Sequence, residues 1–505
     1  MVRVETLTTP RQVPLKAIIS GAVAIPVVVL AVGIGFSVRH VPAAGGSLTV
    51  SLGSQSTFIN PLLASTDTDS AISAAVFSPL LTQSPTGSLA PGLAQSWHVS
   101  NGGRTYTFQL RPGLTWSNGK PVTAYDAAYT FRLLTSPGFT TYSSDWAGAR
   151  ISTPATHTLV VRLPRPDFTF AQNATVGIVP NNYVQDRWPV GAGPFTVSTV
   201  ATNGINLNAR PQFATGAPYL SGIQFLRSAG PAPKTALTCR PSFGASTTAT
   251  LIPTTQLLGL AMNMQTLPAR PVRRALISAL LFNTQSTLIR LSSPTPTWPL
   301  GPVRLTRSGF RPAAQIMQSA GWHLRSGFWW KKGHELVIRL AASSDPTQNQ
   351  VVNALSRAWF QAGFRVSVVR DPFPILVRTV LYPGMFEAAM VDWDFGSPDY
   401  KPGDFWSGGA ALNFGHLNDP LVNRLAVQVP ASASPTTRDY LRTQIGNQIV
   451  LDGAGLGIAQ ESYSCRIPTL LHGYTPPTLV TDAGGLMIGL PQWYENTKLA
   501  LKNPL

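Results

Sequence analysis

The chain has 505 residues, which is too long for a single hydrophobic core, so two or three domains are expected. Charged residues make up only 12%, and Lys plus Arg outnumber Asp plus Glu by 38 to 21, for a net charge of +17. Nucleic-acid binding needs basic side chains gathered into a stripe. Here they are scattered, and only Arg273-Arg274 and Lys331-Lys332 are adjacent, which argues against that class. Attraction to an anionic membrane surface and adaptation to an acidic exterior both remain compatible with the charge.

Residues 17–36 form an uncharged apolar stretch that is long enough to span a bilayer as a helix. Basic residues precede it at Arg3, Arg11 and Lys16, while Arg39 alone follows closely. The positive-inside rule therefore places residues 1–16 in the cytoplasm and the rest of the chain outside. We expect an extracytoplasmic protein with a retained transmembrane anchor, or a secreted one if the helix is a signal that is cleaved near Val41-Pro42-Ala43. A buried core helix is the weaker alternative, because nothing upstream could pack around it.

The chain has two cysteines, Cys239 and Cys465. In an oxidising compartment they could form one disulfide, and they could equally be buried thiols. Intact mass with and without reductant distinguishes the two.

Several elements can be predicted in chain order. Residues 47–54 alternate apolar and polar side chains, which predicts a strand. Residues 96–119 contain two alternating runs around Asn101-Gly102-Gly103, which predicts a β-hairpin. Thr123 is placed to cap a helix that follows it.

The middle of the chain has a different composition. Residues 229–255 are rich in Ala, Thr, Pro and Ser with weak periodicity, which indicates an irregular loop or a connection between domains. After it, residues 315–322 read as the end of a helix, 335–343 as a strand, 348–363 as an amphipathic helix and 364–369 as a strand. This alternation predicts an α/β fold with a mixed sheet covered by helices.

The sequence carries none of the common enzyme motifs. G-x-S-x-G is absent, His334-Glu335 lacks the second His of a zinc-hydrolase helix, and Gly113 to Lys120 does not have P-loop spacing. The seven histidines are dispersed. We therefore expect no catalytic residues, no metal and no cofactor.

Residues 89–131 (LAPGLAQSWHVSNGGRTYTFQLRPGLTWSNGKPVTAYDAAYTF) carry a specific resemblance. In order and spacing they are similar to the signature segment of the family 5 extracellular solute-binding proteins, the dipeptide, oligopeptide and nickel receptors of ABC importers. Further matches follow in family order, at residues 59–63, 190–195, 216–225, 260–276, 319–333 and 393–406. No Cys lies near residues 17–36, so the lipid anchor common among such receptors is replaced here by the expected helix.

The resemblance implies a two-lobed clamp of the type II periplasmic-binding-protein fold, with a subdomain inserted in the first lobe and an N-terminal transmembrane or signal helix before it. Lobe I would comprise residues 47–65, 190–255 and 475–505. The inserted subdomain would be residues 66–189, and lobe II residues 256–474.

The resemblance also implies a ligand site. In peptide-binding relatives an Asp in a Gly-rich turn pairs with the free ammonium of the peptide, and Asp394 matches that position. Its neighbours Asp392 and Trp393 are further candidates for ligand binding; Asp392 would share its face of a strand while Trp393 points to the opposite face. Asp399 and Asp404 complete an acidic cluster that could alternatively be a solvated turn. The remaining candidates are residues of the ligand-contacting loop and one aromatic residue, Gly53, Ser54, Gln55, Phe58 and Trp406, the last of which could instead fill core.

The implied function is capture of a small solute, with a di- or oligopeptide favoured, and delivery to the permease subunits of an ABC importer. A monomer is expected. Nickel chelates, haem or sugars are alternative ligands on the same frame, because a fold does not choose among them. A signalling or structural ectodomain without ligand is the alternative from another class. Asp126 and Arg273 also lie in family motifs, where fixing helix ends is the favoured role.

Overall fold

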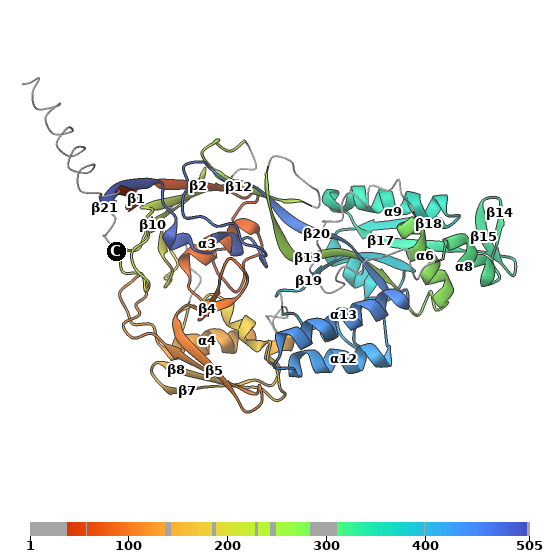
Figure 1. Ribbon diagram of the computed structural model, residues 1–505, viewed down its shortest axis with the longest axis horizontal. Coiled ribbons are helices and arrows are strands. Elements are labelled where there is room, and N and C mark those ends of the chain that lie inside the picture. Colours follow the sequence, from red (N-terminus) through yellow and green to blue (C-terminus); the bar gives the residue numbers. More distant parts are fainter. Residues whose placement is uncertain are drawn as a thin grey trace, which may run out of the picture.

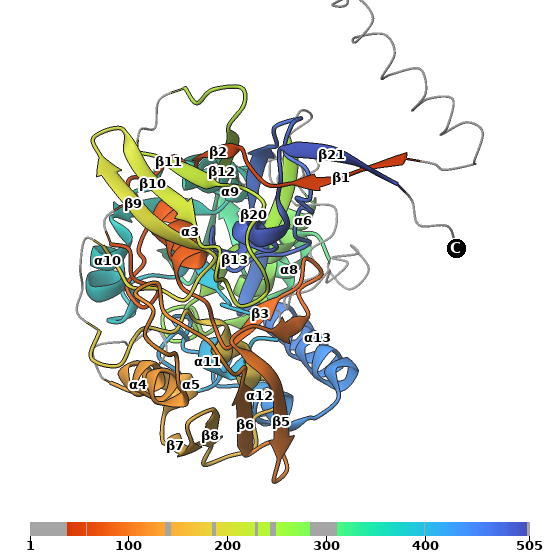
Figure 2. The same cartoon turned by 90° about the vertical axis from the view of Figure 1, so that its left-hand side faces the viewer.

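The computed structural model describes residues 38–56, 58–136, 143–183, 188–227, 231–242, 249–282, 311–397 and 399–501. The elements form two lobes joined by long strands (Figure 1), and a view turned by 90° shows the small sheet of β5 to β8 at the lower end of the molecule (Figure 2). The expected membrane span at residues 17–36 lies outside the described residues. Within them, no helix combines the length and the apolar character needed to cross a membrane.

One mixed ten-stranded sheet runs through both lobes. Its longest strands, β13 and β20, pair with each other in antiparallel orientation. From edge to edge the strands are β18 (Arg365–Asp371), β17 (Val337–Ser343), β19 (Ala388–Asp394), β13 (Thr250–Met262), β20 (Gly455–Arg466), β12 (Leu237–Ser242), β2 (Ser47–Ser51), β11 (Gly222–Leu226), β10 (Gly204–Ala209) and β9 (Phe195–Ala201).

β13 and β20 each enter two hydrophobic cores. Ile252 and Tyr463 belong to the core of lobe I, whose residues lie between 48 and 252 and between 463 and 493. Leu258 and Leu456 belong to lobe II, whose two core clusters use residues 257–459. These strands therefore connect the lobes through the same sheet that supports both cores.

Lobe I packs α3 (Asp67–Val76) and a second, four-stranded sheet into one core. The order of that sheet is β5 (Ala94–Ser100), β6 (Thr105–Leu110), β8 (Thr158–Arg162) and β7 (Arg150–Ala155). The other elements of the lobe are β1 (Val38–Ala43), β3 (Leu81–Gln83), β4 (Leu89–Pro91), α4 (Ala124–Leu134), α5 (Ser143–Trp146), η1 (Phe170–Thr175), η4 (Gly485–Met487), η5 (Leu490–Gln492) and β21 (Asn496–Leu501).

Lobe II has helices on both faces of its part of the sheet. Met390 of β19 lies in one core cluster while Val391 lies in the other, as the two-residue period of a strand buried on both faces requires. The covering elements are α6 (Arg270–Phe282), α8 (Ala313–Ser319), β14 (His323–Arg325), β15 (Phe328–Lys331), β16 (His334–Glu335), η2 (Pro346–Gln348), α9 (Asn349–Gln361), α10 (Phe373–Leu376), η3 (Val377–Leu381), α11 (Gly403–Trp406), α12 (Pro420–Ala431) and α13 (Pro435–Leu451).

The locally encoded predictions are confirmed. β5 and β6 form the expected hairpin, and its turn places Asn101, Gly102 and Gly103 at positive φ. Thr123 precedes α4, and its backbone N–H donates to Asp126 Oδ2 at 2.8 Å, which is one arm of a capping box. The predicted helix and strand after residue 348 are α9 and β18.

The prediction of an irregular loop at residues 229–255 is wrong in part. β12 and the first residues of β13 lie in this range, so much of it belongs to the main sheet. The residues of these strands alternate too weakly to predict a strand, and the strands with which they pair are distant in sequence. The alternative prediction for this range, a connection between the lobes, agrees with β13, which runs from one lobe to the other.

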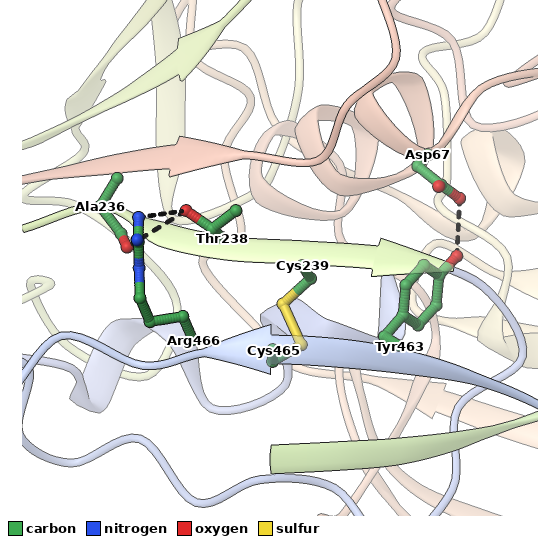
Figure 3. Close-up of a disulfide and its surroundings, with 7 residues drawn as sticks. All are labelled: Asp67, Ala236, Thr238, Cys239, Tyr463, Cys465 and Arg466. Atoms are coloured by element: carbon green, nitrogen blue, oxygen red, sulfur yellow. Dashed lines mark hydrogen bonds between the residues drawn. A yellow bond between two sulfur atoms is a disulfide. The ribbon is translucent and has the colours of Figure 1, made fainter. Parts of the chain in front are cut away.

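Cys239 and Cys465 form a disulfide. They are directly opposite each other in the pairing of β12 with β20, and both are buried. Figure 3 shows the bond between the two strands, with Tyr463 on the same strand as Cys465. The disulfide thus fixes the lobe I end of β20, one of the strands that connect the lobes.

Candidate functional site

Asp394 is the last residue of β19 and lies opposite Gln256 of β13. Its Oδ1 accepts hydrogen bonds from the backbone N–H of Gly396 at 2.9 Å and from Thr255 Oγ1 at 3.0 Å. The residue is open to solvent, yet enough protein surrounds its carboxylate to raise the pKa of Asp394, and the two donors oppose that rise. The carboxylate is therefore held in one orientation at the junction of the lobes, with its solvent access retained.

Asp392 lies on the same face of β19. Its Oδ1 is buried, and none of the described residues donates a hydrogen bond to it. Burial, followed by the charges of Asp394 and Asp345, raises the pKa of Asp392 to about 7. A buried acceptor that lacks a donor is costly in the folded protein, and a ligand that supplies a donor would relieve that cost.

Glu461 of β20 belongs to the same electrostatic group. Burial, followed by the charges of Asp392, Asp67, Asp394 and Asp345, raises the pKa of Glu461 to about 8. This carboxyl group therefore retains a proton over part of the neutral range while no cation is near it.

Lobe I contributes the N-terminus of α3. The side chain of Thr66 caps this helix by accepting from the backbone N–H of Asp69, and Asp67 Oδ1 accepts from Tyr463 Oη at 2.6 Å (Figure 3). Burial raises the pKa of Asp67, and the hydrogen bond from Tyr463 opposes the rise. An acid in the first turn of a helix is stabilised by the positive end of the helix dipole.

The predicted loop at residues 53–58 lies on this helix terminus. Ser54 Oγ is 3.0 Å from Thr68 Oγ1, and the backbone N–H of Phe58 donates to Asp69 Oδ1. Gln55 is exposed and Phe58 is 50% exposed, so both offer surface for a contact. Gly53 has φ +84, and a Cβ there would lie 2.1 Å from the guanidinium of Arg240, so this position needs glycine.

Asp482 adds another carboxylate beside α3. Its Oδ1 accepts from the backbone N–H of Gly484 at 2.8 Å, and burial raises its pKa, with a smaller contribution from the charge of Asp394. The segment before it contacts the connecting strand, because the backbone N–H of Thr255 donates to the carbonyl of Val480.

These carboxylates form one acidic group at the junction of the lobes, linked by mutual effects on their pKa values: Asp67, Asp345, Asp392, Asp394, Glu461 and Asp482. The group is negative in a chain of net charge +17, so it favours a cationic ligand. In the described residues no group of three or more His, Cys, Asp or Glu side chains could hold a metal ion.

Trp393 and Trp406 are placed in the core of lobe II. Each is 3% exposed, and their ring centroids are 4.7 Å apart. Trp393 points to the face opposite Asp392 and Asp394, as predicted, and it packs over Gly259 of β13. In this conformation neither indole offers a surface to a ligand of Asp394.

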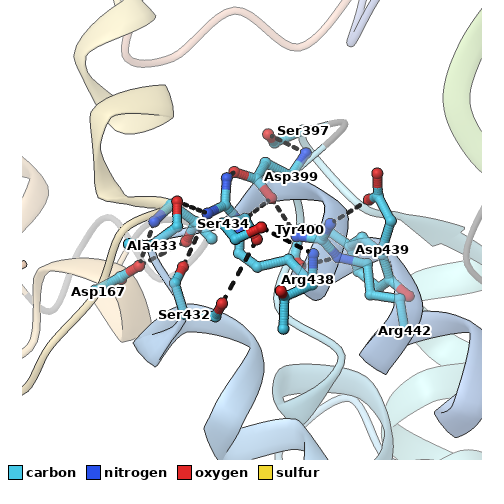
Figure 4. Close-up of polar contacts among 12 residues, drawn as sticks. Asp167, Ser397, Asp399, Tyr400, Ser432, Ala433, Ser434, Arg438, Asp439 and Arg442 are labelled. Atoms are coloured by element: carbon cyan, nitrogen blue, oxygen red, sulfur yellow. Dashed lines mark hydrogen bonds and ion pairs between the residues drawn. The ribbon is translucent and has the colours of Figure 1, made fainter.

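The expected cluster of four acids is divided by the structure. Asp399 forms ion pairs with Arg438 at 2.5 Å and with Arg442, both on α13 (Figure 4). Asp404 lies in the first turn of α11. Asp399 therefore fixes the loop after β19, while the acids that surround Asp394, apart from Asp392 on β19 itself, come from other elements.

Asp67, Glu461 and Asp482 were not among the predicted site residues. Each is distant from Asp394 in the sequence, and pairing of the long strands brings them together. An acid inside the otherwise uncharged strand at 455–465 was a signal that could have indicated Glu461. Arg273 donates to the carbonyl oxygens of Leu267 and Asp452, which agrees with the favoured role of fixing helix ends.

Comparison with known proteins identifies the fold and one segment that matches a known family. Residues 88–237 match the family described as bacterial extracellular solute-binding proteins, family 5 Middle. This segment, less than half of the chain, is thus similar to the family 5 solute-binding proteins. The periplasmic oligopeptide-binding protein OppA of Haemophilus influenzae is 45% identical over 58 residues, which are 12% of this chain and 11% of OppA. The aligned segment thus spans only a small part of the length of this curated relative.

The structural likeness covers far more of the chain. AppA of Bacillus subtilis, solved with a nonapeptide, has a TM-score of 0.67 at 17% identity, over 90% of this chain and 100% of AppA. NikA of Brucella suis, solved with Fe(III)-EDTA, has a TM-score of 0.71 at 17% identity, over 89% of this chain and 100% of NikA. These matches establish the two-lobed α/β fold of periplasmic binding proteins.

Proposed function

We propose that this protein is an extracytoplasmic solute-binding receptor that captures a small solute between its two lobes and delivers it to the permease of an ABC importer. The family 5 match at residues 88–237 and the similarity of the fold to binding proteins support this proposal. Both lobes share one sheet, so rotation about the connecting strands would change the distance between them without unfolding either core. Relatives are named as binding proteins, and we propose binding without turnover.

The proposed ligand is a di- or oligopeptide with a free amino terminus, and the carboxylate of Asp394 carries this assignment. It is fixed by two donors and surrounded by further acids. A ligand ammonium would pair with it in a partly desolvated environment, whereas a blocked amino terminus would leave a carboxylate desolvated and unpaired. The solved complex of AppA with a nonapeptide supports a peptide.

A metal chelate is the second candidate, since NikA was solved with Fe(III)-EDTA. The acidic group at the lobe junction argues against anionic chelates, because its charges would repel them. Haem, a sugar or a signalling role without ligand has no observation in its favour.

We also propose the division of the chain expected from the sequence, with lobe I at 47–65, 190–255 and 475–505, an inserted subdomain at 66–189 and lobe II at 256–474. The change of hydrophobic core near residue 257 supports the start of lobe II, whereas the change near residue 460 favours a return to lobe I at about residue 463, before the expected 475. A helix at residues 17–36 would anchor a monomer in the membrane, with the lobes outside.

The test is binding of alanine di- to pentapeptides, with free and with acetylated amino termini, measured by calorimetry and by the rise in melting temperature. We expect binding of free peptides only, and its loss in Asp394→Asn. Asp371→Asn removes the same charge from the end of β18 and serves as the matched control. Equal binding of acetylated peptides would contradict the role of Asp394. Native mass spectrometry of the purified protein tests for a retained solute, and a retained anionic chelate would contradict the peptide.

A further inference from the structure

Lys401 crosses between the lobes. It follows β19 in lobe II, and its Nζ lies 2.6 Å from Asp145 Oδ1 and 2.7 Å from Asp167 Oδ2, both of which belong to lobe I. The side chains are 18%, 27% and 12% exposed. Ion pairs with this little solvent access are screened less than surface pairs, so they contribute more to holding their elements together.

The acceptors on lobe I are rigid. Asp167 Oδ1 accepts from the backbone N–H of Thr169 at 2.9 Å, and its carbonyl accepts from Tyr106 Oη at 2.5 Å. The adjacent residue forms a second link between the lobes, because the backbone N–H of Phe168 donates to the carbonyl of Pro430 in α12 at 2.7 Å. Asp145 extends from α5, whose Trp146 is fully buried.

The donor is equally well supported. Asp399, in the same loop as Lys401, is bound by Arg438 and Arg442 of α13 (Figure 4). Arg438 also donates to the carbonyl oxygens of Ser432 and Ala433, between α12 and α13. The loop that begins at Asp394 is therefore fixed to lobe II at Asp399 and to lobe I at Lys401.

The ammonium of Lys401 compensates the charges of the acids that meet at this contact between the lobes. Burial alone would lower the pKa of Lys401, but the carboxylates of Asp145 and Asp167 raise it overall. Burial, followed by the charge of Asp145, raises the pKa of nearby Asp404 to about 6. Without the ammonium, Asp145 and Asp167 of lobe I would lose their cationic partner in lobe II and would face Asp404 of lobe II uncompensated, so the attraction between the lobes would be lost.

We propose that Lys401 is a positioning residue that latches the clamp: its ion pairs to Asp145 and Asp167 form when the lobes close and hold the Asp394 loop in its ligand-binding position. This inference rests on the proposed function, in which closure is the approach of the two lobes around a captured solute. Lys401, Asp145 and Asp167 are not among the groups that shift the pKa of Asp394, and the distance between the lobes can be measured without a ligand.

The experiment measures the distance between the lobes in the ligand-free protein. Spin labels at His98→Cys in β5 and Tyr440→Cys in α13 use exposed positions on opposite sides of the latch, and the native cysteines are already paired. Double electron–electron resonance should give a short-distance population in the labelled wild type. Lys401→Met should lower the ratio of short to long distances about tenfold, the effect of roughly 1.4 kcal/mol on a two-state equilibrium.

Four further variants make the result specific. Lys401→Arg retains the charge and should restore the short distances. Asp145→Asn should shift the distribution like Lys401→Met, and the double variant should shift it no further than Lys401→Met alone. Lys120→Met removes an exposed charge from lobe I and should have no effect.

Three outcomes would each overturn the proposal that the ion pairs of Lys401 with Asp145 and Asp167 form a latch between the lobes. They are absence of the short-distance population in wild type, an unchanged distribution in Lys401→Met, and additive shifts in the double variant. Calorimetry with trialanine separates this inference from the proposed function. If the variants open the lobes but no peptide binds to wild type, the latch stands and the peptide assignment fails. If peptides bind and the distances do not respond to Lys401, the latch fails and the receptor assignment stands.

Discussion

Tyr463 of β20 donates its hydroxyl to Asp67 in the first turn of α3, at 2.6 Å. The two residues are far apart in the sequence, and their bond joins a strand that runs through both lobes to the helix under the predicted ligand loop. Tyr463 is 2% exposed, so water does not readily replace this donor.

Tyr463→Phe is therefore expected to destabilise the protein by about 1 to 3 kcal/mol, because Asp67 would remain partly buried with its donor removed. The pKa of Asp67 should rise further, since the hydrogen bond now lowers it. Urea unfolding at pH 7.5 gives the free energy of unfolding. Tyr440→Phe, at a residue that is 62% exposed, is the control and should change stability by less than about 0.5 kcal/mol. Equal stability of the two variants would mean that the bond does not contribute.

The raised pKa values at the lobe junction predict opposite pH dependences for stability and for binding. Asp392 titrates at about 7 and Glu461 at about 8, above the ordinary values of these acids. The folded protein therefore holds protons that the unfolded chain has released, so stability falls as the pH rises from 5.5 to 8.5. The two groups together should lose several kcal/mol, and unfolding at a series of pH values measures it.

The affinity for a cationic peptide should show the opposite pH dependence and rise with pH. The ammonium prefers ionised carboxylates, so affinity should rise about tenfold from pH 5.5 to 7.5, below the pKa of a free α-amino group, with release of protons on binding. Calorimetry of one peptide in buffers of different ionisation enthalpy counts those protons. Glu461→Gln should reduce the count. Proton uptake on binding would show that the sign is wrong.

The disulfide should contribute about 2 to 5 kcal/mol, because Cys239 and Cys465 close a large loop, with a sequence separation of 226. The double variant Cys239→Ser/Cys465→Ser should lose this amount in urea unfolding, and wild type treated with reductant should behave in the same way. Intact mass before and after reduction, with alkylation, verifies the bond. Unchanged stability of the double variant would contradict the contribution.

Sequence patterns predicted what is encoded locally. The hairpin of β5 and β6 follows from alternation and from a turn of Asn101, Gly102 and Gly103, and α9 follows from its helical period. Asp394 was predicted by a family match. Asp67, Glu461 and Lys401 could not be found in this way, because their partners are distant; Lys401 and Asp145 are separated by 256 positions. β12 is composed of residues with little strand preference, and its pairing with β2 and β20 determines its structure.

Gly259 is a site where the connection between the lobes tolerates no side chain. A Cβ at this residue of β13 would lie 2.3 Å from the indole of Trp393 and 2.9 Å from the carbonyl oxygen of Leu456. The register of β13 with β20 shifts beside it, so its neighbours are a core indole on β19 and the backbone of β20. Gly259→Ala should therefore cost about 1 to 3 kcal/mol through displacement of Trp393.

Trp393→Phe provides the matched test, because it removes part of the indole that the new Cβ would meet. Alone it should destabilise by a similar amount through the cavity it leaves. In Gly259→Ala/Trp393→Phe the added methyl group occupies part of that space, so the double variant should lose at least about 0.5 kcal/mol less than the sum of the single variants. Urea unfolding of the four proteins measures this coupling. Strict additivity would mean that the carbonyl of Leu456, and not the indole, is what excludes a side chain at residue 259.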